Sequence, residues 1–298
     1  MTNLQETNQR AKESSQEGGQ FPGGFTVLMA VYRNDDIDLF KKAVRSVFEN
    51  TLQPNHCLIV VDGPIPQPLN TVMEEMEIHY GSSIQFLRLP KNAGLANALN
   101  AGIEQIQTEW IVRADADDVN LPERFMTLAN TIGQNPQVDL LGSDILEVDK
   151  EGGSIAIRTV PTSQREIKQF AQSRNPFNHM TVAYRTEAVK DCGGYPNVYL
   201  REDYALWCLF IHRQKQMLNI PQVLVHATAG KDLYTRRGGW KYAKAEWQMQ
   251  QLLVDLKIKH SLQALRDGLL RSMIFLLPGS LRGLIYTHFL RKATAEKA

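Results

Sequence analysis

The stretch Glu109-Trp-Ile-Val-Arg-Ala-Asp-Ala-Asp-Asp118 joins a short apolar run to three carboxylates. The apolar part is typical of a buried strand, and like charges so close together at its end repel each other. Burial raises this cost unless a cation compensates, and a hard divalent cation with oxygen ligands is the simplest compensation. A metal held by so few carboxylates takes its remaining ligands from water and phosphate. The stretch therefore predicts a site for a metal-bound phosphate compound at a strand end.

Strands and helices alternate upstream of this stretch. Apolar runs predict strands over residues 25–31, 57–61, 84–89 and 109–114, and helical spacing predicts helices over 37–48, 69–80 and 92–106. This alternation indicates βαβ units around a parallel sheet, in which ligands bind beyond the carboxyl ends of the strands. Four polar clusters fall at those ends: Tyr32-Arg33-Asn34, Asp62-Gly63, Pro90-Lys91-Asn92 and Asp115-Ala116-Asp117.

The pattern changes beyond Leu121. Helices are expected over 125–132, 167–173 and 202–213, and strands over 138–148, 154–160, 180–184, 217–220 and 223–226. We expect this half to pack on the first sheet and to form the other wall of a cleft. The predicted fold class is α/β, with a mixed, mostly parallel sheet flanked by helices and a helical C-terminal extension.

Composition and charge exclude several classes of protein. The 298 residues are 43% apolar and 22% charged, as in a globular protein, and a net charge of +1 does not attract nucleic acid. Cys57, Cys192 and Cys208 form no CxxC pair, which favours a reducing compartment. The polar residues 1–22 predict a disordered tail rather than a secretory signal, and no stretch approaches about 18 apolar residues. We therefore expect a cytoplasmic protein without nucleic-acid partners.

The C-terminal part, from about Trp240, is predicted to be helical. A stripe of apolar side chains at three- and four-residue spacing consists of Leu262, Leu265, Leu269, Met273 and Leu276, and it continues after Pro278-Gly279 with arginines beside it. Such helices either lie on an anionic membrane surface or form a hairpin packed on the core. Amphipathicity does not separate the two interpretations.

Several phosphate and metal motifs are missing from the sequence. No P-loop is present, no GxGxxG follows the first strand, and neither HExxH nor GxSxG occurs. Counted from Asp115, the acidic stretch lacks the oxygen ligand, glycine and glutamate that an EF-hand loop requires. These motifs therefore do not account for the acidic cluster.

The ordered set of motifs resembles the family 2 glycosyltransferases, which have the two-lobed GT-A fold. The resemblance covers about residues 25–240 and is most similar to the bacterial polysaccharide and lipopolysaccharide branch, with its amylovoran-type sugar transferases. Its pieces are Val31-Tyr-Arg-Asn34, Val61-Asp-Gly63, Lys91-Asn-Ala-Gly-Leu-Ala-Asn-Ala-Leu-Asn-Ala-Gly102, Arg113-Ala-Asp-Ala-Asp-Asp118, Gly193-Gly-Tyr195 and Glu202-Asp-Tyr-Ala-Leu-Trp207. It implies a nucleotide-sugar-binding half over 23–118, an acceptor-binding half over 119–239 and a helical region over 240–298.

The resemblance also implies roles for the acids at the strand ends. Asp62 matches a carboxylate that accepts a hydrogen bond from uracil, although it could simply close a strand-turn. Asp115 and Asp117 match the DxD pair, with Asp115 near the nucleoside and Asp117 on an Mn²⁺ or Mg²⁺ ion that bridges the diphosphate. Arg113 either neutralises a carboxylate or touches phosphate, and Asp118 is a candidate helix cap.

Glu202 and Asp203 match the acid pair that carries the catalytic base. Inverting transfer needs one carboxylate to take the proton of the acceptor hydroxyl as this attacks the anomeric carbon. A helix N-terminus favours the ionised form, which predicts a group ready to accept a proton at neutral pH. We expect Asp203 to be the base and Glu202 the alternate; both could also be ordinary first-turn acids.

Other polar residues are weaker candidates. The expected wall of the nucleotide-sugar site consists of Tyr32, Asn34, Asn92 and Gly94. His226 is a candidate late metal ligand, and His179 either faces the acceptor or is a hydrogen-bonded structural histidine. Arg236 and Arg237 lie in a glycine-bearing loop that could close on the diphosphate or remain a solvated turn.

Together these features predict an inverting, metal-dependent glycosyltransferase. The donor is expected to be a nucleotide sugar, a UDP-sugar by resemblance, and the acceptor a glycan or lipid-linked glycan of a bacterial surface polysaccharide. A peripheral position on the cytoplasmic face of the inner membrane agrees with the membrane interpretation of the C-terminal helices. The alternatives are a sugar-phosphate nucleotidyltransferase and a non-catalytic binder of nucleotide sugar or glycan.

Overall fold

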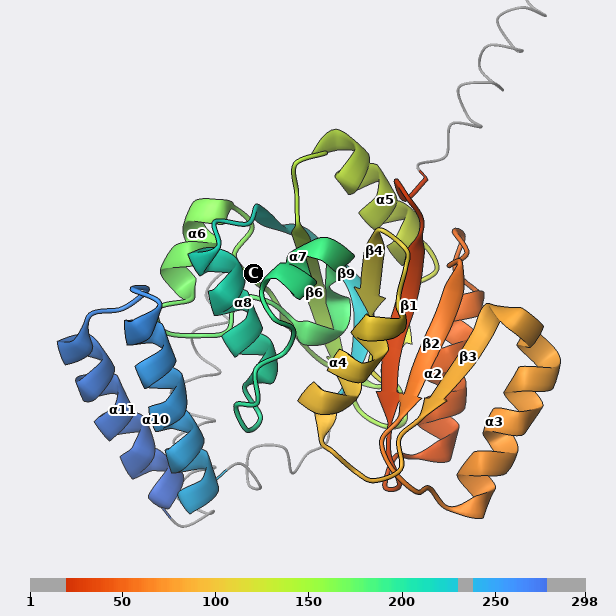
Figure 1. Ribbon diagram of the computed structural model, residues 1–298, viewed down its shortest axis with the longest axis horizontal. Helices are drawn as coiled ribbons and strands as arrows, with labels where there is room; N and C mark the ends of the chain where they lie inside the picture. The colour runs from red at the N-terminus through yellow and green to blue at the C-terminus, as the bar shows by residue number, and fades with distance from the viewer. Residues whose placement is uncertain (1–19, 230–237, 278–298) are drawn as a thin grey trace, which may run out of the picture.

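The first half of the chain forms the predicted alternation of strands and helices. The computed structural model describes residues 20–229 and 238–277. Four parallel strands, β1 (Phe25–Val31), β2 (His56–Val61), β3 (Ile84–Arg88) and β4 (Trp110–Arg113), are joined by α2 (Ile37–Phe48), α3 (Gln67–Tyr80) and α4 (Leu95–Gln105) (Figure 1). Helix α4 begins later than predicted because the backbone of Gly94 takes a φ of +84° before it.

The second half extends the same sheet. Its elements are β5 (Val119–Asn120), α5 (Arg124–Gln134), β6 (Leu140–Val148), β7 (Ser154–Arg158), α6 (Gln164–Phe170), β8 (Ala183–Arg185), α7 (Thr186–Asp191), α8 (Glu202–His212) and β9 (Met217–Thr228). The strand order is β3-β2-β1-β4-β8-β6-β9-β5, with β7 paired to β6, and β8 joins the halves by running antiparallel to β4. The mixed, mostly parallel sheet confirms the predicted fold class.

Strand β9 differs from the prediction of two short strands. Its pairing with β6 runs from Met217 to Thr228, and the register shifts twice, between Ile220 and Val223 and between Val223 and Val225. Pro221 and Gln222 therefore bulge out of the ladder while the strand continues on either side. The pattern misled because a proline in a strand ordinarily marks its end.

Side chains alternate between two cores on opposite faces of the sheet. Val27, Met29 and Val31 of β1 pack with α2, α3 and α5, whereas Leu28 packs with α4, α7 and α8. Helix α4 lies very close to the sheet at Gly102, where an added Cβ would lie only 2.5 Å from Leu28 Cδ1. The result is a three-layer α/β arrangement whose polar strand ends are left at one edge.

The C-terminal helices form a hairpin beside α8. Helix α10 (Trp240–Asp255) packs on α8 through Met249 and Leu253, and α11 (Ser261–Leu276) packs on α10. Hydropathy identifies no helix in residues 20–229 and 238–277 that could span a bilayer. Most of the predicted disordered tail over residues 1–22, and the continuation of the apolar stripe after Leu277, lie outside the described residues.

The close packing of α4 predicts opposite effects for two glycine substitutions. Gly102→Ala should lower the free energy of unfolding by about 1–2 kcal/mol, since overpacking outweighs the gain in helix propensity. Gly133→Ala, at an exposed position of α5 with no atom within 4 Å of the new Cβ, should raise it by about 0.5–1 kcal/mol. Urea unfolding measures both, and equal changes would contradict the close approach of α4.

Candidate active site

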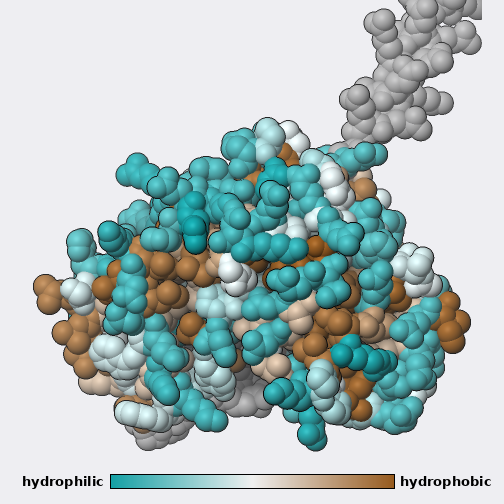
Figure 2. Space-filling model, in the orientation of Figure 1, coloured by the Kyte–Doolittle hydropathy of each residue, from teal (hydrophilic) through white to brown (hydrophobic). Residues whose placement is uncertain are grey.

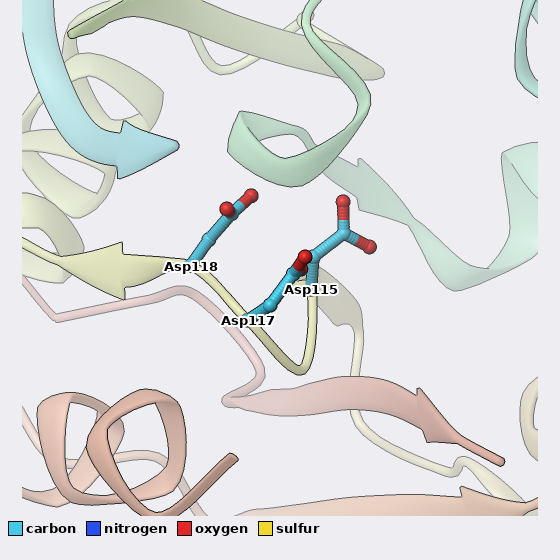
Figure 3. A group of neighbouring side chains, drawn as sticks. All are labelled: Asp115, Asp117 and Asp118. Atoms are coloured by element: carbon cyan, nitrogen blue, oxygen red, sulfur yellow. The ribbon is translucent and has the colours of Figure 1, made fainter. Parts of the chain in front are cut away.

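Three carboxylates converge in the loop between β4 and β5. Oxygens of Asp115, Asp117 and Asp118 lie within 4.8 Å of one another (Figure 3). Asp118 is buried and its Oδ1 accepts a hydrogen bond from Thr228 N at 2.8 Å, at the end of β9. It does not cap α5, which begins after Glu123. The far end of the sheet thus holds the acidic loop in place.

Two buried arginines lie beside this loop. Arg113 is 1% exposed and donates to Asp115 Oδ1 and, at 3.3 Å, to Leu28 O. Arg124 is fully buried and donates to Arg113 O at 2.8 Å; burial and the Arg113 charge lower its pKa to about 9. The geometry therefore favours the ion-pair interpretation of Arg113, because its guanidinium is engaged away from solvent.

The charge of a fourth carboxylate, Asp35, acts on this loop, whereas the sequence pattern offers Asp35 or Asp36 only as a cap of the helix over 37–48. Asp36 caps α2 by accepting from Asp38 N and Leu39 N, whereas Asp35 Oδ2 accepts from Tyr32 N at 2.8 Å. Burial raises the pKa of Asp35 to about 6, and the charge of Asp115 adds to the increase. A signal for this was present in the sequence. Two aspartates are adjacent there, and a helix N-cap needs only one of them, which leaves the other for a different role.

The acidic cluster carries more negative charge than its surroundings compensate. Asp117 is exposed, yet nearby protein atoms displace enough water to raise its pKa to about 6, with the charges of Asp115 and Asp35 adding. Burial also raises the pKa of Asp118 well above its usual value. A hard divalent cation would relieve this repulsion, and grouped carboxylate oxygens are its preferred ligands. The residues therefore fit Mn²⁺ or Mg²⁺.

His226 is not a member of this three-carboxylate group. Its backbone pairs with Val119, next to Asp118, and its role as a metal ligand stays a prediction. Arg236 and Arg237 lie outside the described residues, so their predicted contact with the diphosphate also stays a prediction.

Asp62 organises the neighbouring wall of the site. Its Oδ1 accepts from Ala93 N at 2.7 Å, and its Oδ2 accepts from Gly94 N at 3.0 Å and Asn92 Nδ2 at 2.9 Å. These bonds hold the turn after β3 against the end of β2, as the convergence of strand ends predicts. Gly63 is required there, because a Cβ would lie 2.4 Å from Asn92 N. The contact of Asp62 with a base stays a prediction.

The acid pair lies in the first turn of α8. Asp203 Oδ2 accepts from Asn175 Nδ2 at 2.6 Å, and its Oδ1 accepts from Tyr204 N at 2.7 Å. Burial raises the pKa of Glu202 to about 7, and the Asp203 charge adds to it, so the expected preference for the ionised form is wrong for Glu202. Burial outweighs the helix dipole here. The charge of Asp115 also raises the pKa of Glu202, so the acid pair lies within electrostatic range of the acidic loop.

An aromatic network lies beside the acid pair. His179 Nε2 and Tyr195 Oη are 2.9 Å apart, and Tyr195 Oη lies 3.2 Å from Tyr184 Oη. Burial lowers the pKa of His179 to about 4, so the imidazole is neutral at pH 7. Asn100 of α4 donates to Tyr195 O and accepts from Tyr195 N. These bonds join the Lys91–Gly102 motif to the Gly193–Tyr195 motif. The structural interpretation of His179 fits these contacts.

Comparison with known proteins decides the family. The family model described as "Glycosyl transferase family 2" matches residues 26–204. This chain belongs to glycosyl transferase family 2. It is a glycosyltransferase, as predicted, and the family match covers all four polar strand ends and the acid pair.

Three relatives span nearly the whole chain. An uncharacterized glycosyltransferase of Haemophilus influenzae is 39% identical over 90% of this chain and 99% of its own length. The amylovoran biosynthesis glycosyltransferase AmsE of Erwinia amylovora is 33% identical over 88% of this chain and 97% of its own. An Escherichia coli UDP-Gal:alpha-D-GlcNAc-diphosphoundecaprenol beta-1,3-galactosyltransferase is 34% identical over 90% of this chain and 97% of its own length.

Solved structures show the same GT-A fold in distant sequences. TarS 1–349 of S. aureus superposes with a TM-score of 0.62 at 15% identity, over 89% of this family 2 chain and 75% of TarS. The mannosyltransferase PcManGT of Pyrobaculum calidifontis, in complex with GDP-Man and Mn2+, has a TM-score of 0.60 at 14% identity, over 96% and 89%. These likenesses confirm the fold.

The raised pKa of Glu202 predicts a pH-dependent cost in stability. Between its ordinary value of 4.5 and its folded value of about 7, the folded state binds more protons, so rising pH destabilises it. Relative to wild type, Glu202→Gln should gain about 1–3 kcal/mol of unfolding free energy between about pH 4 and about pH 8.

Urea unfolding across this range measures the difference. Glu166→Gln is the matched control, because Glu166 is exposed and hydrogen bonds from Ser163 lower its pKa. The unfolding free energy of Glu166→Gln relative to wild type should fall, rather than rise, as pH increases. A Glu202→Gln difference that does not change with pH would contradict the raised pKa.

Proposed function

We propose that this family 2 glycosyltransferase is an inverting, metal-dependent enzyme of bacterial exopolysaccharide or lipopolysaccharide synthesis. It would transfer a sugar from a nucleotide sugar, a UDP-sugar, to a glycan acceptor. The observation that carries the proposal is the three-carboxylate cluster at the end of β4, within electrostatic range of the Glu202–Asp203 pair. The printed names of the Erwinia amylovora and Escherichia coli relatives, and a TarS complex with UDP-GlcNAc, support the donor and the pathway.

The acidic loop would hold the donor's diphosphate through a metal ion. Asp117 and Asp115 would ligate Mn²⁺ or Mg²⁺, and the bound ion would supply positive charge for the leaving nucleoside diphosphate. Asp115 lies toward the nucleoside in this arrangement, and Arg113 keeps its carboxylate oriented. Tyr32, Asn34, Asn92 and Gly94 would line the nucleoside, on the turns that follow β1 and β3.

Asp203 would act as the base. Its carboxylate takes the proton of the acceptor hydroxyl as the new C–O bond forms and the bond to the diphosphate breaks, so one displacement inverts the anomeric centre. Two N–H donors hold this carboxylate in a fixed orientation. Glu202, whose pKa burial raises to about 7, is the alternate base. No covalent enzyme intermediate is needed.

The two rival functions are weakened by different observations. Family 2 membership argues against a sugar-phosphate nucleotidyltransferase. A non-catalytic binder would not require a carboxylate such as that of Asp203, which two donors orient. Sugar transfer by the purified protein separates the binder from the enzyme.

The outer face of α11 supports a membrane-bound acceptor. The predicted stripe is at least half exposed along its length, with exposed fractions of 80% for Leu262, 50% for Leu265 and Leu269, 57% for Met273 and 52% for Leu276. Figure 2 shows apolar side chains gathered on the side of the molecule where α10 and α11 lie. The Escherichia coli relative is named for a diphosphoundecaprenol-linked acceptor. The proposal therefore includes peripheral contact with the cytoplasmic face of the inner membrane.

Two substitutions separate donor binding from transfer. Asp117→Ala should abolish Mn²⁺-dependent donor binding, because it removes a metal ligand. Asp203→Asn should keep donor affinity within about twofold and lower transfer by about a hundredfold or more, because it removes the base. A thermal-shift screen of nucleotide sugars with Mn²⁺ selects the donor, and calorimetry and a transfer assay give the two readouts. Unchanged donor binding by Asp117→Ala would remove the metal assignment, and normal transfer by Asp203→Asn would move the base to Glu202.

The membrane contact is tested on the surface of α11. Replacing Leu265, Leu269 and Met273 together by serine should weaken co-sedimentation with anionic phospholipid vesicles by about tenfold or more, since apolar area drives interfacial binding. The matched control replaces the exposed Ile155 and Ile157 of β7 by serine and should bind as wild type does. Equal binding by wild type and the triple variant would contradict the membrane contact.

A further inference from the structure

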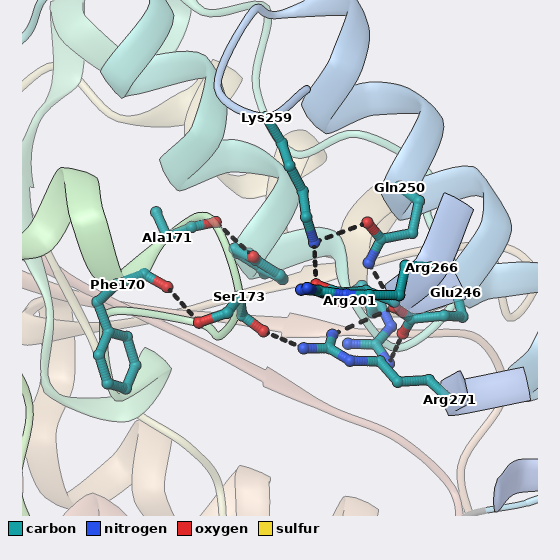
Figure 4. Close-up of polar contacts among 11 residues, drawn as sticks. Phe170, Ala171, Ser173, Arg201, Glu246, Gln250, Lys259, Arg266 and Arg271 are labelled. Atoms are coloured by element: carbon teal, nitrogen blue, oxygen red, sulfur yellow. Dashed lines mark hydrogen bonds and ion pairs between the residues drawn. The ribbon is translucent and has the colours of Figure 1, made fainter. Parts of the chain in front are cut away.

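A buried carboxylate in the C-terminal hairpin joins two arginines. Glu246 of α10 is fully buried, and it accepts from Arg201 Nη2 at 2.6 Å, from Arg271 Nη1 at 3.2 Å and from Gln250 Nε2 at 2.7 Å (Figure 4). Removing one partner of such a buried ion pair strongly destabilises the fold, because the other charge is left buried and unpaired. Glu246 thus fixes the places of two arginines from different parts of the chain.

The two arginines contact or belong to the two chain segments that flank the Asp203 carboxylate. Arg201 directly precedes α8 and is two residues from Asp203. Arg271 also donates through Nη2 to Ser173 O, two residues before Asn175. Asn175 then donates to Asp203 Oδ2 at 2.6 Å. The two segments that orient the Asp203 carboxylate are therefore both tied to Glu246.

Further contacts join the same two segments. Tyr204, next to Asp203, donates its hydroxyl to Ala171 O at 2.5 Å. Leu200 has a φ of +54°, a conformation that costs energy for a residue with a Cβ and needs support from its surroundings. The guanidinium of the next residue, Arg201, lies 6.0 Å from the ring centroid of Phe275 on α11. The turn before α8 is thus held by the hairpin.

We propose that Glu246 is a positioning residue for the base Asp203, and that the C-terminal hairpin is part of the catalytic unit. Proton transfer requires the base within hydrogen-bond reach of the acceptor hydroxyl, and a displacement of about 1 Å can cost about a hundredfold in rate. Glu246 lies outside the family match, which ends at residue 204. The inference rests on the proposed function, since it assigns Asp203 the role of base.

The experiment compares Glu246→Gln with Asp267→Asn. Both remove a carboxylate from an ion pair in the hairpin. Asp267 pairs with Lys259 at 2.6 Å and with Arg266, and it is linked to Glu246 through Lys259 and Gln250. It contacts neither arginine that Glu246 holds and neither segment beside Asp203. In Glu246→Gln, hydrogen exchange should become faster at residues 171–177 and 200–206. Its kcat should fall by about ten- to a hundredfold, with the donor KM within about twofold. Asp267→Asn should leave both readouts at the wild-type level.

Coupling to Asp203 is tested by a double mutant. If Glu246 acts through Asn175, the effects of Glu246→Gln and Asn175→Ala on kcat should be less than additive. Arg271→Lys, which keeps the charge but cannot bridge Glu246 and Ser173 O as a fork, replaces Glu246→Gln should that variant not fold.

The two readouts distinguish the inference from the proposed function. Unchanged exchange at both segments in a folded variant overturns the positioning role, whatever the activity. Equal losses of kcat in Glu246→Gln and Asp267→Asn overturn it as well. A wild-type protein that transfers no sugar from any nucleotide sugar overturns the proposed function, and the exchange measurement still decides whether Glu246 holds the two segments.

Discussion

The charge balance at the end of β4 is the constraint around which the site is built. Asp115, Asp117 and Asp118 follow the strand, and Asp35 faces them from the turn after β1. The described chain compensates with two buried arginines and a hydrogen bond from the end of β9. Because this compensation is incomplete, the pKa values of Asp35, Asp117 and Asp118 are raised, and a divalent cation would relieve the repulsion. Distant strands are therefore needed to maintain one short acidic loop.

Several motif residues shape the walls of the site rather than project into it. Asp62 holds the turn over residues 92–94, and Asn100 holds Tyr195 against α4. Arg113 is engaged by Asp115 beneath the loop. Such residues fix the backbone on which ligand-contacting groups stand, and preorganisation of this kind is what electrostatic catalysis requires. A family motif thus contains both the contacts and their supports.

The two faces of the C-terminal hairpin have different proposed roles, one toward the membrane and one toward the base. The outer face of α11 is apolar, while the inner side of the hairpin carries Glu246 and the network behind Asp203. An acceptor at a membrane surface would then approach a base that is held from the same structural element. The hairpin gives the family 2 core a support that the matched region alone does not contain.

The sequence by itself determined the order of strands and helices through β4, the acidic loop and the acid pair, because periodicity and spacing are local properties. It also carried enough ordered motifs to indicate the family. Only the tertiary structure decided that the charge of Asp35 acts on the acidic loop, that Asn175 orients Asp203, that β9 continues past Pro221, and that burial raises the pKa of Glu202. Apart from the Asp35–Asp36 adjacency, these outcomes depend on contacts between residues far apart in the chain, or on burial, and neither leaves a local pattern.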